Sequence, residues 1–200
     1  MTYGIVALES HSLINQNHEL NNEIHEHNPS KFHLDDFSQY STTAAVYALP
    51  AFGVKPIHSL KYRLVNSLIA NGIMAITTLS IKETGTVWRP DHTSSNSFPS
   101  GHTATAFVGA EQLWQEYKDI SPWYGIAGYS VATATGFFRM YNNRHWFSDV
   151  AMGAGIGIMS TKIAYWISPL LINEQGKSSN ISFVPIYDNK NISVLATINF

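Results

Sequence analysis

The sequence predicts an all-α fold, a bundle of about six helices whose candidate site residues stand at helix ends, followed by a C-terminal β-hairpin. Two observations support this prediction. Long stretches without a charged residue alternate with breaks that contain Pro or Gly, which is typical of packed helices joined by loops. The last stretch of the chain instead alternates apolar and polar residues, which is typical of a strand.

The first half of the chain predicts helices at His11–His27, Ser41–Phe52 and from about Leu60 to Glu83. Asn28-Pro29-Ser30 and Gly53–Pro56 would end the first two, because Pro and Gly interrupt a helix. His11, His18 and His25 repeat every seven residues, so one helix face would carry them. We interpret that face as solvated rather than as a metal site, because residues two turns apart lie about 10 Å from one another.

The second half predicts helices from about His102 to Tyr117, from Ser121-Pro122 to Arg139, and from about Asp149 to Ile167, where Pro169 ends the last. The residues at 84–101 and at Tyr141–Phe147 are expected to form loops beside the helix ends. Gly153 and Gly157 indicate close helix packing, since small residues let two backbones approach.

The tail differs from the rest. After a linker, Asn173–Asn180, the segments Ile181–Tyr187 and Ile192–Phe200 are strand-like. We therefore expect a helical domain at 1–172 and a linker with a hairpin at 173–200. A two-stranded hairpin is marginal alone, so it would have to pack on the helices, a partner or a membrane.

Composition narrows the function. The net charge of −2 gives no basic surface for nucleic acid, and the absence of cysteine excludes disulfides and thiolate chemistry. Charged residues make up only 13% of the chain, about half the usual share of a globular protein. The mean hydropathy is close to zero, which is low for a chain that is mostly transmembrane.

Membrane contact is possible. The longest uncharged stretches are Phe37–Val54, Leu64–Ile81 and Ile120–Phe138. Each nearly reaches the 20 or so residues that span a bilayer, but each also carries polar residues. On this basis a soluble or peripheral protein is favoured slightly over an integral one. Met1–Ser10 shows no secretory signal.

Three short blocks carry most of the chemical information. Lys82 stands before Arg89-Pro90, then comes Pro99-Ser100-Gly101-His102, and then Arg139, His145 and Asp149 follow in order. Cations that converge on one point favour a tetrahedral oxyanion such as phosphate. Two histidines can divide the roles of nucleophile and general acid, and a carboxylate can orient one of them. The blocks predict a metal-free phosphoryl-transfer site.

These blocks resemble the signature of the type 2 phosphatidic acid phosphatase superfamily, which is Lys-x6-Arg-Pro, Pro-Ser-Gly-His and Ser-Arg-x5-His-x3-Asp. The resemblance covers roughly residues 34 to 170. One position departs, because Phe138 stands where the family has serine. The gap between the first two blocks, Asp91–Phe98, is also short, which leaves little room for a specificity lid.

The resemblance implies the residue roles. Lys82, Arg89 and Arg139 would hold the phosphoryl oxygens, and Ser100 and the Gly101 N–H would add hydrogen bonds. His145 would attack phosphorus, Asp149 would orient it, and His102 would protonate the leaving oxygen. The substrate would be a phosphorylated small molecule or, by analogy with the family's lipid phosphatases, a lipid. No cofactor is implied.

The resemblance leaves alternatives open. The same pocket could hold vanadate, as in the vanadium-dependent haloperoxidases of this superfamily, although the chain is short for that branch. A non-catalytic anion-binding protein of the cell envelope is the second alternative. Each site residue, taken singly, could also be a surface charge or a helix cap. A periplasmic or envelope membrane-associated location is expected, and the oligomeric state is left open.

Overall fold

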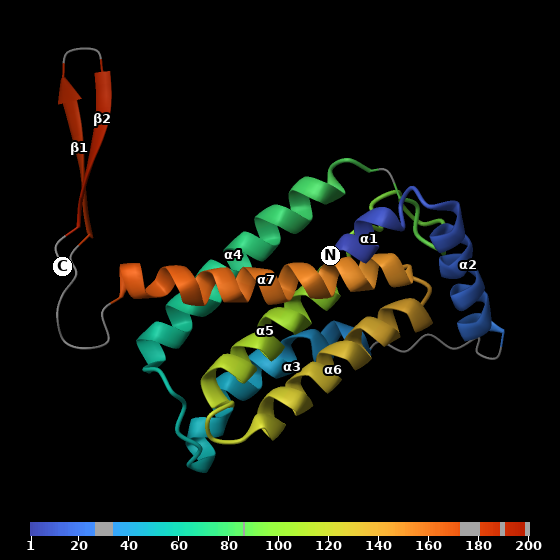
Figure 1. Ribbon diagram of the computed structural model, residues 1–200, viewed down its shortest axis with the longest axis horizontal. Coiled ribbons are helices and arrows are strands. Elements are labelled where there is room, and N and C mark those ends of the chain that lie inside the picture. Colours follow the sequence, from blue (N-terminus) through green and yellow to red (C-terminus); the bar gives the residue numbers. More distant parts are fainter. Residues whose placement is uncertain (27–33, 86, 173–180, 189–190, 199–200) are drawn as a thin grey trace.

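The computed structural model describes residues 1–26, 34–85, 87–172, 181–188 and 191–198. These ranges contain seven α-helices, one 3-10 turn and one pair of strands (Figure 1): α1 Thr2–Val6, α2 His11–His25, α3 Leu34–Ala48, η1 Leu49–Phe52, α4 Leu60–Lys82, α5 Gly101–Tyr117, α6 Pro122–Tyr141, α7 Phe147–Leu171, β1 Ile181–Asp188 and β2 Asn191–Ile198. The predicted all-helical architecture is confirmed. The predicted break at Asn28-Pro29-Ser30 and the linker at 173–180 lie outside the described residues.

Several helix boundaries differ from those predicted. The helix α3 begins at Leu34 rather than Ser41, with two acidic residues in its first turn, where the helix dipole favours negative charge. It ends at Ala48, because Pro50 cannot donate the next helical hydrogen bond, and a 3-10 turn follows. The helix α7 continues past Pro169 to Leu171, since a proline in the last turn removes only one bond.

The helix α5 is the centre of the bundle. It contacts α3, α4, α6 and α7, and most of its residues are buried. Close approach of α7 to the start of α5 depends on Gly153, where a Cβ atom would lie 2.5 Å from the Ser100 carbonyl oxygen. Gly157 makes a similar approach to Ala104, one turn further along. The interpretation of these glycines as packing residues is confirmed, and their packing holds the second block of site residues against the third.

The N-terminal helices lie at the same end of the bundle as the site (Figure 1). The side chain of Asn17 on α2 donates to Ser148 Oγ at 3.1 Å and accepts from the Ser148 N–H at 3.3 Å. His18 packs edge-on against Trp146, with ring centroids 4.6 Å apart. These contacts join α2 to the start of α7. His11 and His18 are both exposed, as predicted for a solvated face, and His18 in addition packs on Trp146.

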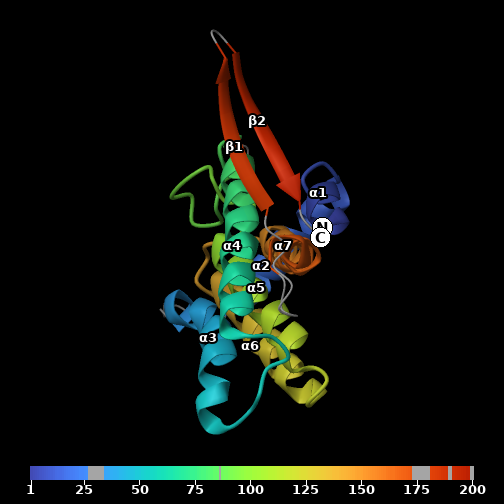
Figure 2. The same ribbon diagram turned by 90° about the vertical axis from the view of Figure 1, so that its left-hand side faces the viewer.

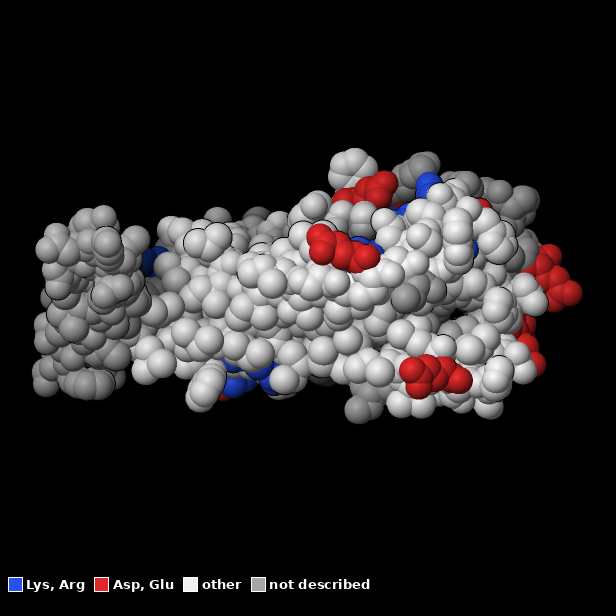
Figure 3. All heavy atoms as spheres, turned by 90° about the horizontal axis from the view of Figure 1, so that it is seen from above, with Lys and Arg blue, Asp and Glu red and all other residues white. Residues whose placement is uncertain are grey.

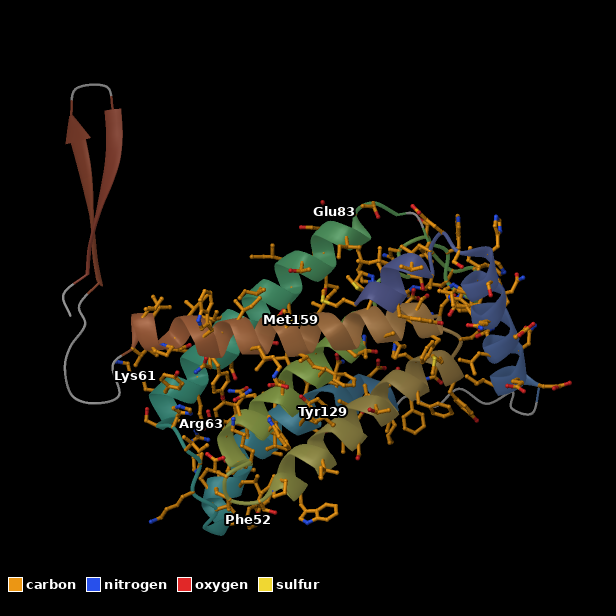
Figure 4. All side chains as sticks on the ribbon, in the orientation of Figure 1. Phe52, Lys61, Arg63, Glu83, Tyr129 and Met159 are labelled. Atoms are coloured by element: carbon orange, nitrogen blue, oxygen red, sulfur yellow. The ribbon has the colours of Figure 1, made fainter. Side chains whose placement is uncertain are left out.

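Two helices are long and apolar enough to cross a membrane, α4 and α7. Only 22% of the apolar window of α4 and 44% of that of α7 are buried in the bundle. Figure 2 shows α4 on the outside of the bundle. The face in Figure 3 carries few charged side chains over these helices, and Figure 4 shows Lys61 and Glu83 at opposite ends of α4. The stretch Leu64–Ile81 lies within α4.

The C-terminal strands pair antiparallel, with Ile181 opposite Ile198 and Asp188 opposite Asn191. The strand bounds differ by a residue or two from those predicted, and residues 199 and 200 lie outside the described part. The hairpin as a stable part of the fold stays a prediction.

Candidate active site

The predicted site residues lie at helix ends, or in the loops beside them, at one end of the bundle. Lys82 is the last residue of α4, Ser100 is the N-cap of α5, and Arg139 lies in the last turn of α6. His145 lies between α6 and α7, and Asp149 lies in the first turn of α7. The Ser100 N–H donates to the Asp149 carbonyl oxygen at 3.0 Å, so the second and third blocks are joined directly.

His145 and Asp149 form a buried pair. His145 Nδ1 lies 3.3 Å from Asp149 Oδ2, and the two side chains are 2% and 0% exposed. Asp149 Oδ2 also accepts from Ser97 Oγ at 2.5 Å and from the Trp146 N–H at 2.9 Å. A proton on Nδ1 leaves the lone pair of His145 on Nε2. The pKa of His145 is lowered to about 4, chiefly by burial and also by the charges of Arg139 and Lys82, against the opposing effect of Asp149.

The arginines line a polar cavity of about 340 Å³. Its walls are Asp35, Asp36, Arg89, His102, Arg139, Asn142 and Arg144. Burial, followed by the nearby charges of Arg139 and Arg144, lowers the pKa of Arg89. In the described part of the chain, Nε of Arg89 and Nε of Arg139 are buried and have no hydrogen-bond partner. Crowded cations with unsatisfied donors favour a bound anion.

Lys82 and Arg89 meet at Asn96. Lys82 Nζ donates to the Asn96 carbonyl oxygen at 2.7 Å, and Arg89 donates to the Asn96 side-chain oxygen at 3.2 Å. Lys82 does not line the cavity directly, but its charge acts on the pKa of His145, so it lies close to the site. Asn96 holds these two cations on the loop that joins α4 to α5.

His102 faces the cavity from the first turn of α5. Its Nε2 lies 3.1 Å from Asp36 Oδ1, and its side chain is 30% exposed. Burial and the Arg139 charge lower the pKa of His102, while the hydrogen bond to Asp36 acts in the opposite direction. A cavity-facing imidazole beside the arginines can exchange a proton with a bound phosphate ester.

Ser100 and Gly101 begin α5. Ser100 Oγ is buried and accepts from Thr103 Oγ1 at 2.9 Å and from the Thr103 N–H at 3.5 Å. Ser100 therefore caps the helix. The cap uses the acceptor capacity of the hydroxyl and not its proton. Ser100 itself is fully buried and is absent from the lining of the polar cavity. The Gly101 N–H is among the first donors of α5, which lack helical partners and favour negative charge.

The sequence prediction missed a group of polar residues around the site: Asp35, Asp36, Asn96, Ser97, Asn142 and Arg144. Asp35 is buried and pairs with Arg139, and it accepts from Asn142 at 2.9 Å. Arg144 pairs with Asp91 at 3.1 Å. The signal for the acidic residues was their position immediately before an uncharged stretch, which the misplaced start of α3 concealed.

Phe138 packs in an aromatic group on α6. Its ring meets Phe137 and Tyr141 edge-on, with centroids 6.2 Å and 6.5 Å away. It lies beside Arg139 in sequence but is absent from the lining of the polar cavity. Within the described residues, no three His, Asp or Glu side chains gather closely enough to hold a metal ion.

The sequence is similar to known proteins. Over 142 residues, or 70% of the chain, the sequence is 42% identical to a lipid A 1-phosphatase of Porphyromonas gingivalis, of which the match covers 32%. It is 32% identical over 81 residues to the bacitracin transport permease protein BcrC of Bacillus licheniformis, which is 40% of this chain and 38% of that protein. The chain thus spans about a third of the length of these relatives.

Two solved structures share the fold. The LpxE protein of Aquifex aeolicus matches with a TM-score of 0.57 at 24% identity, over 76% of this chain and 95% of that one. A transmembrane PAP2-type phosphatidylglycerolphosphate phosphatase of Bacillus subtilis matches with a TM-score of 0.60 at 19% identity, over 87% and 96%. The family model of the PAP2 superfamily matches residues 41–172 and so covers all three blocks. This chain belongs to the PAP2 superfamily.

Proposed function

We propose that the chain is a metal-independent phosphatase that hydrolyses lipid-linked phosphomonoesters or pyrophosphates through a phosphohistidine intermediate. The observation that carries this proposal is the buried contact of His145 with Asp149, close to the cavity lined by Arg89 and Arg139. The likeness to a lipid A 1-phosphatase supports the choice of a lipid substrate.

In the first step, Nε2 of His145 attacks phosphorus. The Nδ1–H donated to Asp149 keeps the attacking nitrogen unprotonated, and the carboxylate stabilises the positive charge that forms on the ring. The new N–P bond forms as the bond from phosphorus to the leaving oxygen breaks, and His102 donates a proton to that oxygen. The product of this step is a phosphohistidine and a free alcohol or, from a pyrophosphate, a phosphomonoester.

In the second step, neutral His102 takes a proton from water, and the water oxygen attacks phosphorus. The N–P bond breaks, inorganic phosphate forms, and the electron pair returns to Nε2 of His145. Lys82, Arg89 and Arg139 offset the charge on the phosphoryl oxygens through both steps, with the Ser100 hydroxyl and the Gly101 N–H as further donors.

The proposal includes a membrane location, with the site toward the periplasmic side of the envelope. The helices α4 and α7 each have an apolar window that is mostly unburied within the bundle, which suits contact with lipid. Many of their outward side chains are large and apolar: Leu64, Leu68, Ile76, Leu79, Met159, Trp166 and Leu170. This surface makes an integral protein the better proposal than the soluble one favoured from the sequence.

The domain division at residue 172 and the packed C-terminal hairpin remain part of the proposal.

A phosphate-release screen of the purified protein tests the proposed function. The substrates are p-nitrophenyl phosphate, phosphatidic acid, phosphatidylglycerol phosphate, undecaprenyl pyrophosphate and phosphorylated lipid A. We expect phosphate release from the lipid substrates. EDTA should leave this activity intact, and vanadate should inhibit it. Activity lost in EDTA and restored by magnesium or zinc would contradict metal independence. Vanadate-dependent bromide oxidation by peroxide would favour the haloperoxidase alternative, and anion binding without any phosphate release would favour the non-catalytic one.

A further inference from the structure

Two adjacent acids at the start of α3 line the polar cavity and have different surroundings. The Asp35 side chain is 2% exposed and is held by Arg139 and Asn142, which ties the start of α3 to the end of α6. The Asp36 side chain is 51% exposed and reaches into the cavity. Both acids also lie in the first turn of α3, where negative charge stabilises the helix dipole. This is the simpler explanation for their presence.

The position of Asp36 is specific, however. Its Oδ1 atom lies 3.1 Å from Nε2 of His102 and 3.7 Å from an Nη atom of Arg139. His102 is the group that would protonate the leaving oxygen, and Arg139 would hold the transferred phosphoryl group. Under the proposed function, Asp36 therefore lies beside the leaving group of a bound substrate.

A carboxylate at this point affects substrates unequally. A diphosphate ester cleaved at its terminal phosphorus has a second phosphate as its leaving group, and that negative charge would lie beside Asp36. Like charges at such distances repel, and the repulsion persists where solvent screening is incomplete. A leaving group with hydroxyl or amide N–H donors instead offers hydrogen bonds that the carboxylate accepts.

We propose that Asp36 is a specificity-determining residue that selects phosphomonoesters with a neutral leaving group and disfavours diphosphate esters. This inference rests on the proposed function, because it uses His102 to define the leaving-group side. It narrows the choice between phosphomonoesters and pyrophosphates that the proposed function leaves open. Specificity here depends on one unfavourable contact with the wrong substrate.

The test compares kcat/KM for farnesyl phosphate and farnesyl diphosphate, which share one lipid and differ by one phosphate. In the wild type we expect the monophosphate to be preferred. In Asp36→Asn, that preference should fall on the order of tenfold, which is a modest like-charge effect at a half-exposed site. The gain should appear in the diphosphate reaction, and high salt should reduce the wild-type preference in the same direction.

Two variants serve as controls. Asp36→Glu keeps the charge and should keep the preference. Asp119→Asn removes one negative charge from an exposed residue just beyond the far end of α5, about 25 Å along the helix, and should also keep it. A purely structural role for Asp36 would lower thermal stability and slow both substrates equally. That outcome, or an unchanged ratio in Asp36→Asn, would overturn the inference.

A binding measurement separates this inference from the proposed function. Inorganic phosphate and methylenediphosphonate, which cannot be hydrolysed, are titrated against wild type and Asp36→Asn. We expect the substitution to tighten methylenediphosphonate binding about tenfold more than phosphate binding. If neither farnesyl substrate releases phosphate but this difference holds, the proposed function fails and the charge selection stands. Equal changes for both anions would reject the charge selection.

Discussion

His145 and His58 each have a carboxylate at Nδ1, at opposite ends of α5. His145 lies 3.3 Å from Asp149, and His58 lies 3.0 Å from Glu116. Around His145 there are cations and, close by, a polar cavity. Around His58 there are aromatic rings: Tyr62 stacks on it at 4.3 Å, and Tyr165 meets it edge-on at 5.8 Å.

The second pair has a structural explanation. Glu116 accepts from Tyr165 at 2.5 Å and from the backbone N–H of His58 at 3.1 Å, and the Ile57 N–H donates to its carbonyl oxygen at 3.1 Å. These contacts fasten the segment before α4 to the end of α5. The comparison shows that a histidine–carboxylate pair indicates catalysis only where an anion can reach it and cations can stabilise that anion.

The largest expected effect is that of His145→Ala. Loss of the nucleophile should lower the rate of phosphate release by about 10⁴-fold or more. A 32P-labelled substrate should leave an acid-labile, base-stable label on the quenched wild type and none on the variant. The matched variant His58→Ala should label normally. Label that persists in His145→Ala would remove this residue from the role.

Arg139→Lys is expected to have the next largest effect. Lysine keeps the charge but loses the two parallel donors. The activation free energy of turnover should therefore rise by about 2–4 kcal/mol, so that kcat falls while KM changes less. The Asp35 contact is an additional reason for the loss, because lysine cannot reproduce the guanidinium geometry. A wild-type rate would show that Arg139 is not a phosphate clamp.

Phe138→Ser separates packing from chemistry at the one position that departs from the family signature. If Phe138 only packs against Phe137 and Tyr141, the substitution should lower the melting temperature and leave kcat nearly unchanged. A fall in kcat comparable to that of Arg139→Lys would show instead that Phe138 holds the arginine in place.

The pH dependence should also distinguish the catalytic pair. His145 acts as a neutral nucleophile, so activity should rise as pH increases through its pKa of about 4. His102 acts as an acid, so activity should fall as pH increases through a pKa that burial places below 6.5. A bell-shaped profile of kcat/KM with an acidic optimum between these values is expected. An activity that keeps rising above neutral pH would contradict His102 as the proton donor.

The smallest effect on activity is expected at the structural pair. Glu116→Gln and His58→Ala should leave kcat within error of the wild type. Each should lower the free energy of unfolding by about 1–3 kcal/mol, because a buried hydrogen-bonding group loses a partner. Thermal unfolding in detergent measures this loss. A large fall in kcat from either variant would show that the far end of α5 is coupled to the site.

The prediction of the site depended most directly on sequence for residues that are close together in the chain. Arg139, His145 and Asp149 are close together in the sequence. The end of α6, a short loop and the start of α7 are therefore enough to bring them together. Their convergence with Lys82 and Ser100 was inferred by resemblance. Asp36, Ser97 and Asn96 were missed, because each acts through a partner distant in sequence or across a loop whose path has no periodic signature.

Sequence alone determined the helical class, the order of the helices and the residues of the three blocks, because hydrophobic patterning and breaks by Pro and Gly act over short distances. Only the tertiary structure decided which of two histidine–carboxylate pairs lies close to the polar cavity, and that the first turn of α3 supplies that cavity with two acids. These outcomes depend on how α3, α5, α6 and α7 pack together, and packing brings together charges that no local pattern relates.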